Sequence, residues 1–529
     1  MLDANTLPSD VESLKRLLIE RDATIEAKDL ALREKQREVE HLKWQLAKLL
    51  RARFGQSSEQ LRASGQLPLS LEQLQAAVAA AQREEAVLAA AAARGKPVRR
   101  KQLPEHFVRI EKVIEPEECH CPDCGGPLSE LGKADIAEVL EVKTVSFTVT
   151  RHIRPKKRCP KCSTIVQAPA PSRPIEKSFA GASLLALVLT WKYGFHLPLY
   201  RQCQIFAQAG LEVSRTTLMQ WVAASSALLE PLVAALAKYV LSAANLNADD
   251  TPIRVLAPGQ GKTRKGRLWT YVRDGRPWRS RDPPAVWYQY SPSWRGVYPQ
   301  KHLARYCGKL QVDAYAGFDA LFAPSEPNKQ PQIVEVACAA HMRRKFFDLY
   351  TAQQSPLARE ALDRFGELYR IEEAIRGRSP EERHRARQQY ALPLLKAFHA
   401  WMIEKLGQVE KKSELAGALQ YALNNWDALV RYTEDGCLEI DNSAAERSIR
   451  GIGVGRRNYL FLGSDSGGER AAIIYALIET CKLNGLDPQA YLQYVLERIA
   501  EHPINRIEEL LPWNVANELP SARARTLAA

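Results

Sequence analysis

Two pairs of closely spaced cysteines give the most specific chemical signal in the sequence. Cys121 and Cys124 lie in CPDCGG, and Cys159 and Cys162 lie in CPKC. Two such pairs of thiolates are the usual ligands of a tetrahedral Zn²⁺ site, and the intervening segment can form the hairpin that brings them together. Cys119 is a competing ligand. The pattern therefore predicts a zinc-binding ribbon, a module that the metal stabilises because it is too small to fold well alone.

Three acidic positions form a second candidate site. Asp249 and Asp250 end the strand-like run NLNADD, a second strand in KLQVDAYAGF delivers Asp313, and Glu446 lies in the helical segment DNSAAERSIR. Carboxylates of this kind hold Mg²⁺ or Mn²⁺, and two such ions activate the nucleophile and stabilise the leaving oxygen in phosphoryl transfer. A solvated surface carboxylate explains each acid singly, since the chain has 61 acidic residues. The order of strand, strand and helix favours one shared site on a ribonuclease-H-like sheet.

Other acids and several basic side chains surround these positions in the sequence. Glu469 and Glu479 are rival candidates for the third metal ligand. We prefer Glu446 because Asn442 and several arginines lie on either side of it in the sequence. The side chains expected to position or neutralise a phosphate are His341, Arg343 and Arg344 after IVEVACAA, and Arg447 and Arg450 after Glu446. Surface solvation explains any one of them equally well.

The segment LPLYRQCQIFAQAGLEVSRTTLMQWV predicts two helices joined by a turn at residues 209–213, with Ser214 as the cap of the second helix. In a helix-turn-helix the start of the second helix reads bases in the major groove. The candidate DNA-binding residues there are Arg215, Thr216, Thr217 and Gln220. A plain helical hairpin fits the same pattern.

The composition predicts a multidomain α/β protein whose parts position these residues. Leu18, Ile25, Leu32, Val39 and Leu46 recur every seven residues, which indicates a coiled coil or a single amphipathic helix packed on its own chain. The predicted segments are a leucine-zipper-like coiled coil over 1–55, a linker with a helix and a basic cluster over 56–115, the zinc ribbon over 116–174, the helix-turn-helix bundle over 175–243, the catalytic core over 244–345 and 436–455, a helical insertion over 346–435 and a C-terminal helical module over 456–529.

Charge and cysteine content indicate the partner and the compartment. The net charge of +13 favours a polyanionic partner, although ribosomal, histone-like and membrane-surface proteins share it. Ten cysteines, four of them in two pairs, favour a reducing compartment over a disulfide scaffold. The opening MLDANTLPSDVES lacks the features of a secretory signal, and the apolar stretch at 182–189 is shorter than the roughly 20 residues of a bilayer span. We expect a soluble, cytoplasmic, nucleoid-associated protein.

Over nearly its whole length the sequence resembles the transposases of the insertion sequence 66 family, a DDE group of bacterial mobile elements. The matching blocks, in order, are RARFGQSSEQL, CPDCGGPL, CPKC, KYGFHLPLYRQ, DDTPIRVL, VDAYAGF, CAAHMRRKFF, DNSAAERSIR, RRNYLFLGSDSGGERAAIIYALIETCKLNGLDP and LLPW. The resemblance implies that Asp249, Asp313 and Glu446 form the metal-binding catalytic triad and that the four paired cysteines bind Zn²⁺. Asp250 stands where the family usually has glutamate. Either Asp249 or Asp250 can therefore be the first metal ligand.

Together these features predict a DNA transposase that binds the ends of its insertion sequence and catalyses strand cleavage and strand transfer with Mg²⁺ or Mn²⁺. The alternative is a non-catalytic, sequence-specific DNA-binding regulator derived from a transposase. A nuclease of the same fold that hydrolyses without joining fits the same residues. The expected partners are DNA and a second copy held through the coiled coil, and the family implies accessory proteins of the same element.

Overall fold

The computed structural model describes residues 147, 149, 156–158, 165–167, 172–176, 178–257, 259, 261–323 and 331–519. Apart from residues 147 and 149, these lie in a compact unit formed by Met1–Gly55 and Thr150–Ala529. The expected coiled coil, the basic linker and the four paired cysteines lie outside the described residues. Two short antiparallel strands, β1 (Lys156–Arg158) and β2 (Ile165–Gln167), bracket the CPKC sequence.

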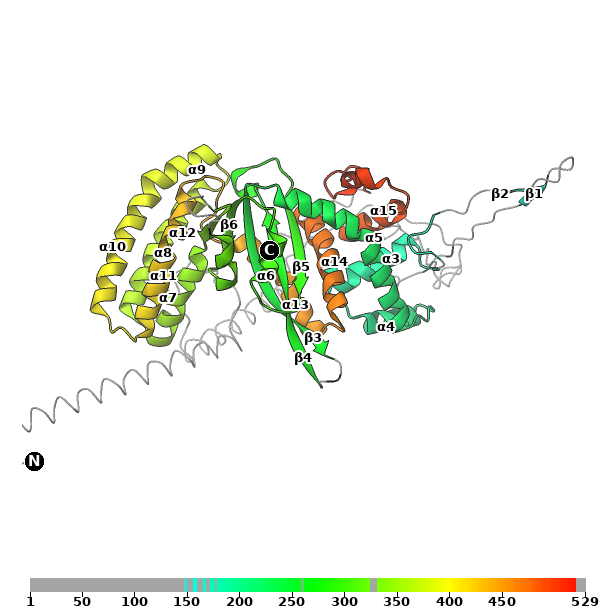
Figure 1. The fold of residues 1–529 in the computed structure, drawn as a ribbon, viewed down its shortest axis with the longest axis horizontal. Helices are drawn as coiled ribbons and strands as arrows, with labels where there is room; N and C mark the ends of the chain where they lie inside the picture. Colours follow the sequence, from blue (N-terminus) through cyan, green and yellow to red (C-terminus); the bar gives the residue numbers. More distant parts are fainter. Residues whose placement is uncertain are drawn as a thin grey trace, which may run out of the picture. The chain divides into compact units, whose positions relative to one another are not determined.

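A five-stranded mixed sheet in the order β5-β4-β3-β6-β7 forms the centre of this unit (Figure 1). Its strands are β3 (Asn245–Ala257), β4 (Lys262–Arg273), β5 (Ala285–Ser291), β6 (Gly308–Val312) and β7 (Ile333–Ala337). The pairs β3–β4 and β4–β5 are antiparallel, whereas β3–β6 and β6–β7 are parallel. The predicted mixed α/β class is confirmed, and the carboxyl ends of three neighbouring strands meet at one edge.

Helices cover both faces of the sheet. On one face lie α13 (Ser443–Asn458) and α14 (Asp465–Leu483), and on the other lie α6 (Val297–His302) and the 3-10 turn Ala316–Leu321. Neighbouring residues of β4 show the division, because successive strand side chains point to opposite faces. Thr270 Oγ1 lies 3.1 Å from Ser448 Oγ of α13, while the Trp269 ring packs edge-on against the rings of His302 and Phe318.

One local prediction about these elements is wrong. The acidic pair does not end its strand, because β3 continues to Ala257, pairing with β4 along its length.

The glycine-rich segment FLGSDSGGER leads into a helix. Ser464 caps α14, and both Gly467 and Gly468 lie inside that helix. Gly468 is needed there since a Cβ atom would lie 2.4 Å from the Tyr290 ring.

Helices from both ends of this unit pack beside the sheet. They are α3 (Ala182–Leu189), continued by a π-turn at Thr190–Gly194, then α4 (Leu199–Gln208), α5 (Arg215–Leu241), α15 (Pro488–Arg498) and the 3-10 turn Ile504–Leu510. Helix α15 packs on α3, and α14 packs on both β5 and α5. By length and composition alone α5 could cross a membrane, but its buried side chains, among them Leu229 and Leu236, pack inside this unit.

A block of helices is inserted between β7 and α13. It comprises α7 (Ala339–Gln353), α8 (Pro356–Ile375), α9 (Pro380–Ala386), a π-turn at Arg387–Ala391, α10 (Leu392–Gln408), α11 (Glu414–Asn424), α12 (Trp426–Val430) and the 3-10 turn Arg431–Thr433. Its core is aromatic and aliphatic, with Phe346, Phe365, Phe398 and Trp426 in contact. Serine caps begin α8, α9 and α11, so the boundaries follow ordinary capping chemistry.

Two buried arginines join this block to the segment that leads into α13. Arg387, which is fully buried, donates two hydrogen bonds to the Glu372 carboxylate and others to the carbonyls of Tyr432, Asp435 and Leu438. Arg383 donates to the carbonyls of Gly436 and Leu438. The path of residues 435–438 is therefore fixed by side chains of the insertion.

Candidate active site

The fold gathers four of the predicted site residues from four separate elements. Asp249 lies in β3, Asp313 follows β6 directly, His341 lies in the first turn of α7 after β7, and Glu446 lies in the first turn of α13. The parallel pairing of β3 with β6 stops at Asn247, so Asp249 lies two residues beyond it. The acids consequently meet where the parallel ladder ends.

The electrostatic environment of Asp249 reflects this meeting. Burial is the largest cause that raises the pKa of Asp249 well above its ordinary value, and the negative charges of Asp313, Asp250 and Glu446 raise it further. The N–H of Asp250 donates a 2.7 Å hydrogen bond to Asp249 Oδ1, which opposes the rise. Like charges that crowd a carboxylate in this way are typical of sites that bind a cation.

Strand alternation separates the two neighbouring aspartates. Asp249 is paired across the ladder with Thr270, which contacts α13, so Asp249 shares the face that carries Glu446. Asp250 points to the other face, where Arg267 Nη1 donates to it at 2.7 Å and Trp294 Nε1 donates at 3.1 Å. Because Asp250 already has a cation and an indole as partners, Asp249 is the better candidate for a metal ligand.

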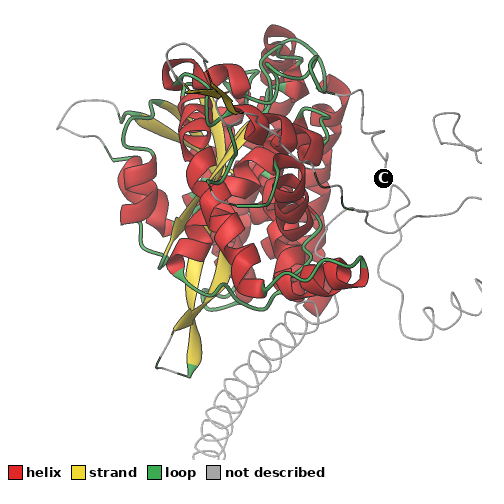
Figure 2. Ribbon diagram, turned by 90° about the vertical axis from the view of Figure 1, so that its right-hand side faces the viewer, coloured by secondary structure: helices red, strands yellow, loops and turns green. Residues whose placement is uncertain are grey.

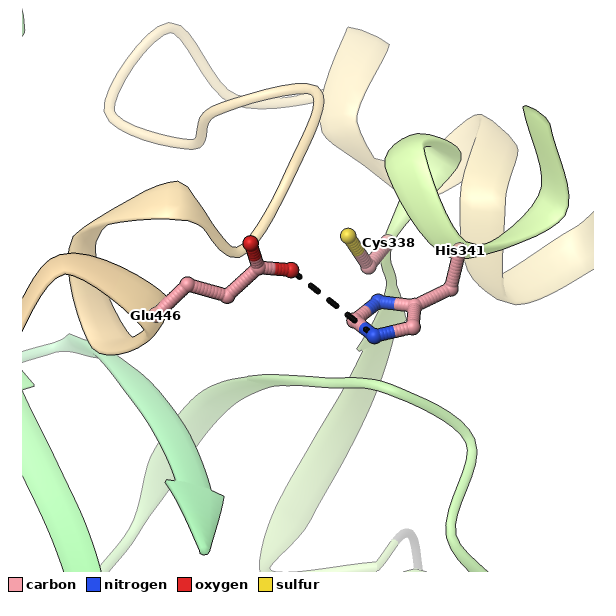
Figure 3. Close-up of side chains that lie close together, drawn as sticks. All are labelled: Cys338, His341 and Glu446. Atoms are coloured by element: carbon pink, nitrogen blue, oxygen red, sulfur yellow. Dashed lines mark ion pairs between the residues drawn. The ribbon is translucent and has the colours of Figure 1, made fainter. Parts of the chain in front are cut away.

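The side chains of His341 and Cys338 lie close to that of Glu446 (Figure 3). The His341 Nε2 lies 3.7 Å from Glu446 Oε1. Cys338 completes a group whose potential ligand atoms all lie within 4.8 Å of one another. Burial raises the pKa of the Cys338 thiol well above its usual range, and its Sγ accepts a hydrogen bond from the Asn442 N–H at 3.1 Å. In the metal-free chain Cys338 is therefore a buried, neutral hydrogen-bond acceptor.

A buried network of amide side chains links the elements that carry the acids. Asn247 Nδ2 donates to Gln311 Oε1 at 3.1 Å and to Asn442 Oδ1 at 3.0 Å. Asn442 Nδ2 donates to the carbonyl of Ala248 at 2.7 Å. Asn247 and Gln311 precede Asp249 and Asp313 by two residues, which is one strand repeat, and Asn442 precedes Glu446 by four, about one helical turn. Each of the three acids thus has an amide side chain close to it in sequence, and hydrogen bonds between these amides connect the elements that carry the acids.

Replacing Asn442 with alanine is expected to lower cleavage about 10- to 100-fold, the usual effect of removing a group that orients a metal ligand. The change leaves the Ala248 carbonyl buried without this donor and frees the first turn of α13. The Mn²⁺ or Mg²⁺ concentration that gives half-maximal cleavage should rise. Asn458→Ala, at the exposed end of the same helix, is the control, and equal metal curves for both variants would contradict the orienting role.

The predicted phosphate-binding side chains differ in how accessible they are. Arg447 and Arg450 are exposed on α13. Arg344 and His341 are half-buried, whereas Arg343 is only 8% exposed. A side chain this buried is poorly placed to reach a phosphate. The rival acid Glu479 pairs with Lys482 at 2.7 Å and Glu469 is exposed on α14, and neither is among the charges that raise the pKa of Asp249.

The candidate DNA-reading residues lie at the start of α5. Ser214 caps this helix, as the sequence predicts, by accepting a 3.0 Å hydrogen bond from the Thr217 N–H. Arg215, Thr216 and Gln220 are exposed, and Thr217 is half-buried. Further along α5, side chains such as Leu229 and Leu236 are buried, whereas Glu230 and Lys238 are exposed.

Comparison with known proteins decides the family. The sequence model described as "Transposase IS66 family" matches residues 177–470, which contain the whole sheet, the acids and the helical insertion. The chain belongs to the IS66 transposase family. Three further models of the IS66 transposases match in order, described as "Transposase C of IS166 homeodomain" over residues 41–111, "zinc-finger binding domain of transposase IS66" over 118–163 and "IS66 C-terminal element" over 476–513. The zinc-finger match spans all four paired cysteines, which supports Zn²⁺ as a cofactor.

Relatives of this IS66 transposase family member occur in Sinorhizobium fredii (strain NBRC 101917 / NGR234). Uncharacterized protein y4hP is 40% identical over 494 residues, covering 89% of this chain and 88% of the relative. Uncharacterized protein y4qI is 35% identical over 534 residues, covering 97% of this chain and 98% of the relative. The similarity thus extends over both the zinc-finger region and the sheet.

Proposed function

We propose that this chain is a DNA transposase that cleaves and joins DNA strands by metal-dependent phosphoryl transfer, with Asp249, Asp313 and Glu446 as its catalytic carboxylates. The observation that carries the proposal is their approach from two parallel strands and one helix, with hydrogen-bonded amide side chains between those elements. This order of elements favours a ribonuclease-H-like core interrupted by the helical insertion.

The residues fit a divalent cation by their own chemistry. Among the described residues, neither Asp249 nor Asp313 has a lysine or arginine ion pair, and the buried Glu446 Oε1 makes no hydrogen bond. Carboxylate oxygens are the ligands that Mg²⁺ and Mn²⁺ prefer. When bound there, such ions would supply Lewis-acid activation of the attacking oxygen and stabilise the leaving oxygen.

The chain's own residues hold and orient the reacting groups. Asp250 is neutralised by Arg267 and leaves Asp249 as the acid on the α13 side. His341 Nε2 lies 3.7 Å from Glu446 Oε1 on the other side of the edge. Arg447 and Arg450 lie exposed one residue and one turn beyond Glu446, so they offer cations to the phosphates beside the scissile bond.

The remaining parts serve binding and assembly in this proposal. The cysteines Cys121, Cys124, Cys159 and Cys162 hold Zn²⁺, and the first turns of α5 read the element's end together with this ribbon. The residues 1–55 join two copies so that two ends are held together. Accessory proteins of the same element and a cytoplasmic, nucleoid-associated location belong to the same proposal.

The test is incubation of the purified chain with a labelled duplex that carries the element's own end, in Mg²⁺, Mn²⁺ or EDTA, followed by a denaturing gel. We expect nicked products and slower-migrating joined products in either metal and none in EDTA. Tight binding of the end without any product would instead favour the non-catalytic regulator. Hydrolysis without joined strands, in the presence of a target duplex, would favour the nuclease.

A further inference from the structure

The β3–β4 hairpin extends beyond the rest of the sheet as a two-stranded ribbon (Figures 1 and 2). The neighbouring strand β5 ends its pairing with β4 at Arg267, but β4 continues to pair with β3 from Gly266 back to Lys262. At about 3.3 Å per residue this overhang is about 15 Å long. A two-stranded ribbon of this kind is only marginally stable by itself, so its shape requires support from elsewhere.

One face of the ribbon supplies that support. Val255 and Ile253 are buried on it, and Arg264 on the same face forms an ion pair with Asp465 at the start of α14. The edge of β3 is also held, because the N–H of Leu256 donates to the carbonyl of Leu462 at 2.8 Å and the N–H of Leu462 donates to the carbonyl of Arg254. We call this side the anchored face.

The opposite side, the free face, carries Arg254, Leu256, Thr263 and Lys265. Arg254 and Lys265 are exposed cross-strand partners, an arrangement that like charges make unfavourable. Neither makes an ion pair among the described residues, and between Thr251 and Leu268 the sequence has five basic residues and no acid. The repulsion between these two cations lowers the stability of the hairpin, and a bound polyanion would relieve it. The contacts of the anchored face hold the ribbon in place for such a partner.

We propose that the free face of the β3–β4 hairpin binds the phosphate backbone of duplex DNA. Arg254 lies five residues beyond Asp249, or about 16 Å at about 3.3 Å per residue, and by strand alternation it shares the face of Asp250, so this contact lies away from the scissile phosphate. The inference rests on the proposed function in taking duplex DNA as the partner. Contacts of this kind position the duplex and carry no sequence information.

The test measures the affinity of the full chain for the end duplex in EDTA, over a series of salt concentrations. Because each cation that neutralises a phosphate contributes about 0.9 to the slope of log affinity against log salt, Arg254→Gln with Lys265→Gln should lower the slope by roughly 1.8. Affinity at about 0.1 M salt should fall roughly tenfold or more. The control is Lys411→Gln with Lys412→Gln, two exposed cations in the loop after α10, which should leave the slope unchanged.

A second pair of variants separates charge from structure. Arg254→Lys with Lys265→Arg should restore the slope, and ethylation of individual phosphates should reveal backbone positions that interfere with binding of the wild type but not of the glutamine variant. Equal slopes for the glutamine variant and its control would overturn the inference. The two cations would then be solvated side chains that prevent the hairpin from pairing with the strand edge of another chain. Since binding is measured without metal, failure of the proposed chemistry would appear only in the cleavage assay.

Discussion

Replacing Asp249 with asparagine is expected to abolish strand cleavage and joining, by at least about 1000-fold or on the order of 4 kcal/mol in the barrier, while end binding stays within about twofold. The amide keeps the size of the side chain but removes the negative oxygen that a divalent cation requires. The candidate DNA-reading residues lie on α5 and are not altered. Gel assays of cleavage and salt-titrated binding measure the two effects separately.

The same variant should be more stable than the wild type at neutral pH without metal. Burial and the neighbouring carboxylates raise the pKa of Asp249 in the folded chain, so its stabilising contribution is complete below the unfolded pKa and is lost as pH rises through the folded pKa. Asparagine stays neutral and avoids this loss. Thermal unfolding in EDTA from about pH 4 to pH 8 should show the advantage of the variant shrinking as pH falls.

Asp250→Asn is the matched comparison. Burial raises the pKa of Asp250 as well, but the charge of Arg267 opposes that rise, so Asp250→Asn should stabilise the metal-free chain at neutral pH less than Asp249→Asn does. If Asp249→Asn cuts DNA while Asp250→Asn does not, the two roles are reversed and the argument from strand alternation is wrong.

Replacing Arg387 with alanine is expected to lower the free energy of unfolding by about 3–5 kcal/mol, the usual cost of leaving one charge of a buried pair alone. Glu372, only 7% exposed, would lose its bidentate partner. The carbonyls of Tyr432, Asp435 and Leu438 would lose their donor as well. Chemical denaturation followed by tryptophan fluorescence measures the change.

Two further variants make this prediction specific. Arg385→Ala, exposed at the end of α9 two residues before Arg387, should change stability by no more than about 0.5 kcal/mol. Arg387→Met with Glu372→Leu should recover much of the loss, because an apolar pair avoids the unpaired buried charge. If Arg387→Ala were as mild as Arg385→Ala, the arginine would not hold the insertion to residues 435–438.

The sequence predicted those parts of the fold and site that depend on local pattern. Ser214 as a helix cap, Asp313 directly after a strand and Glu446 on a helix are all recognisable from neighbouring residues, and the structure places them so. The continuation of β3 was missed because paired aspartates and Pro252 are poor strand formers. Pairing with β4 and the bridge to Leu462 override that preference.

The sequence could not give the contacts that depend on the tertiary fold. Asn247 and Gln311 precede the acids by two residues, a spacing that was visible, but polar residues at such positions are common and only the sheet order makes them partners. Arg343 was assigned to DNA, yet it lies 8% exposed over the Phe347 ring. Burial of an arginine cannot be read from local pattern, since its long apolar stem packs as readily as it extends.

The position of the helical insertion in the chain has a consequence for protein synthesis. Asp249 and Asp313 are translated before the insertion, and Glu446 comes only after it, on a helix whose lead-in is held by Arg383 and Arg387. A nascent chain that has not yet emerged past the insertion lacks the third acid, and it also lacks α14 and α15, on which α5 and α3 pack. Under the proposed function, incomplete copies would therefore be unable to cut DNA until the last part of the chain has been made.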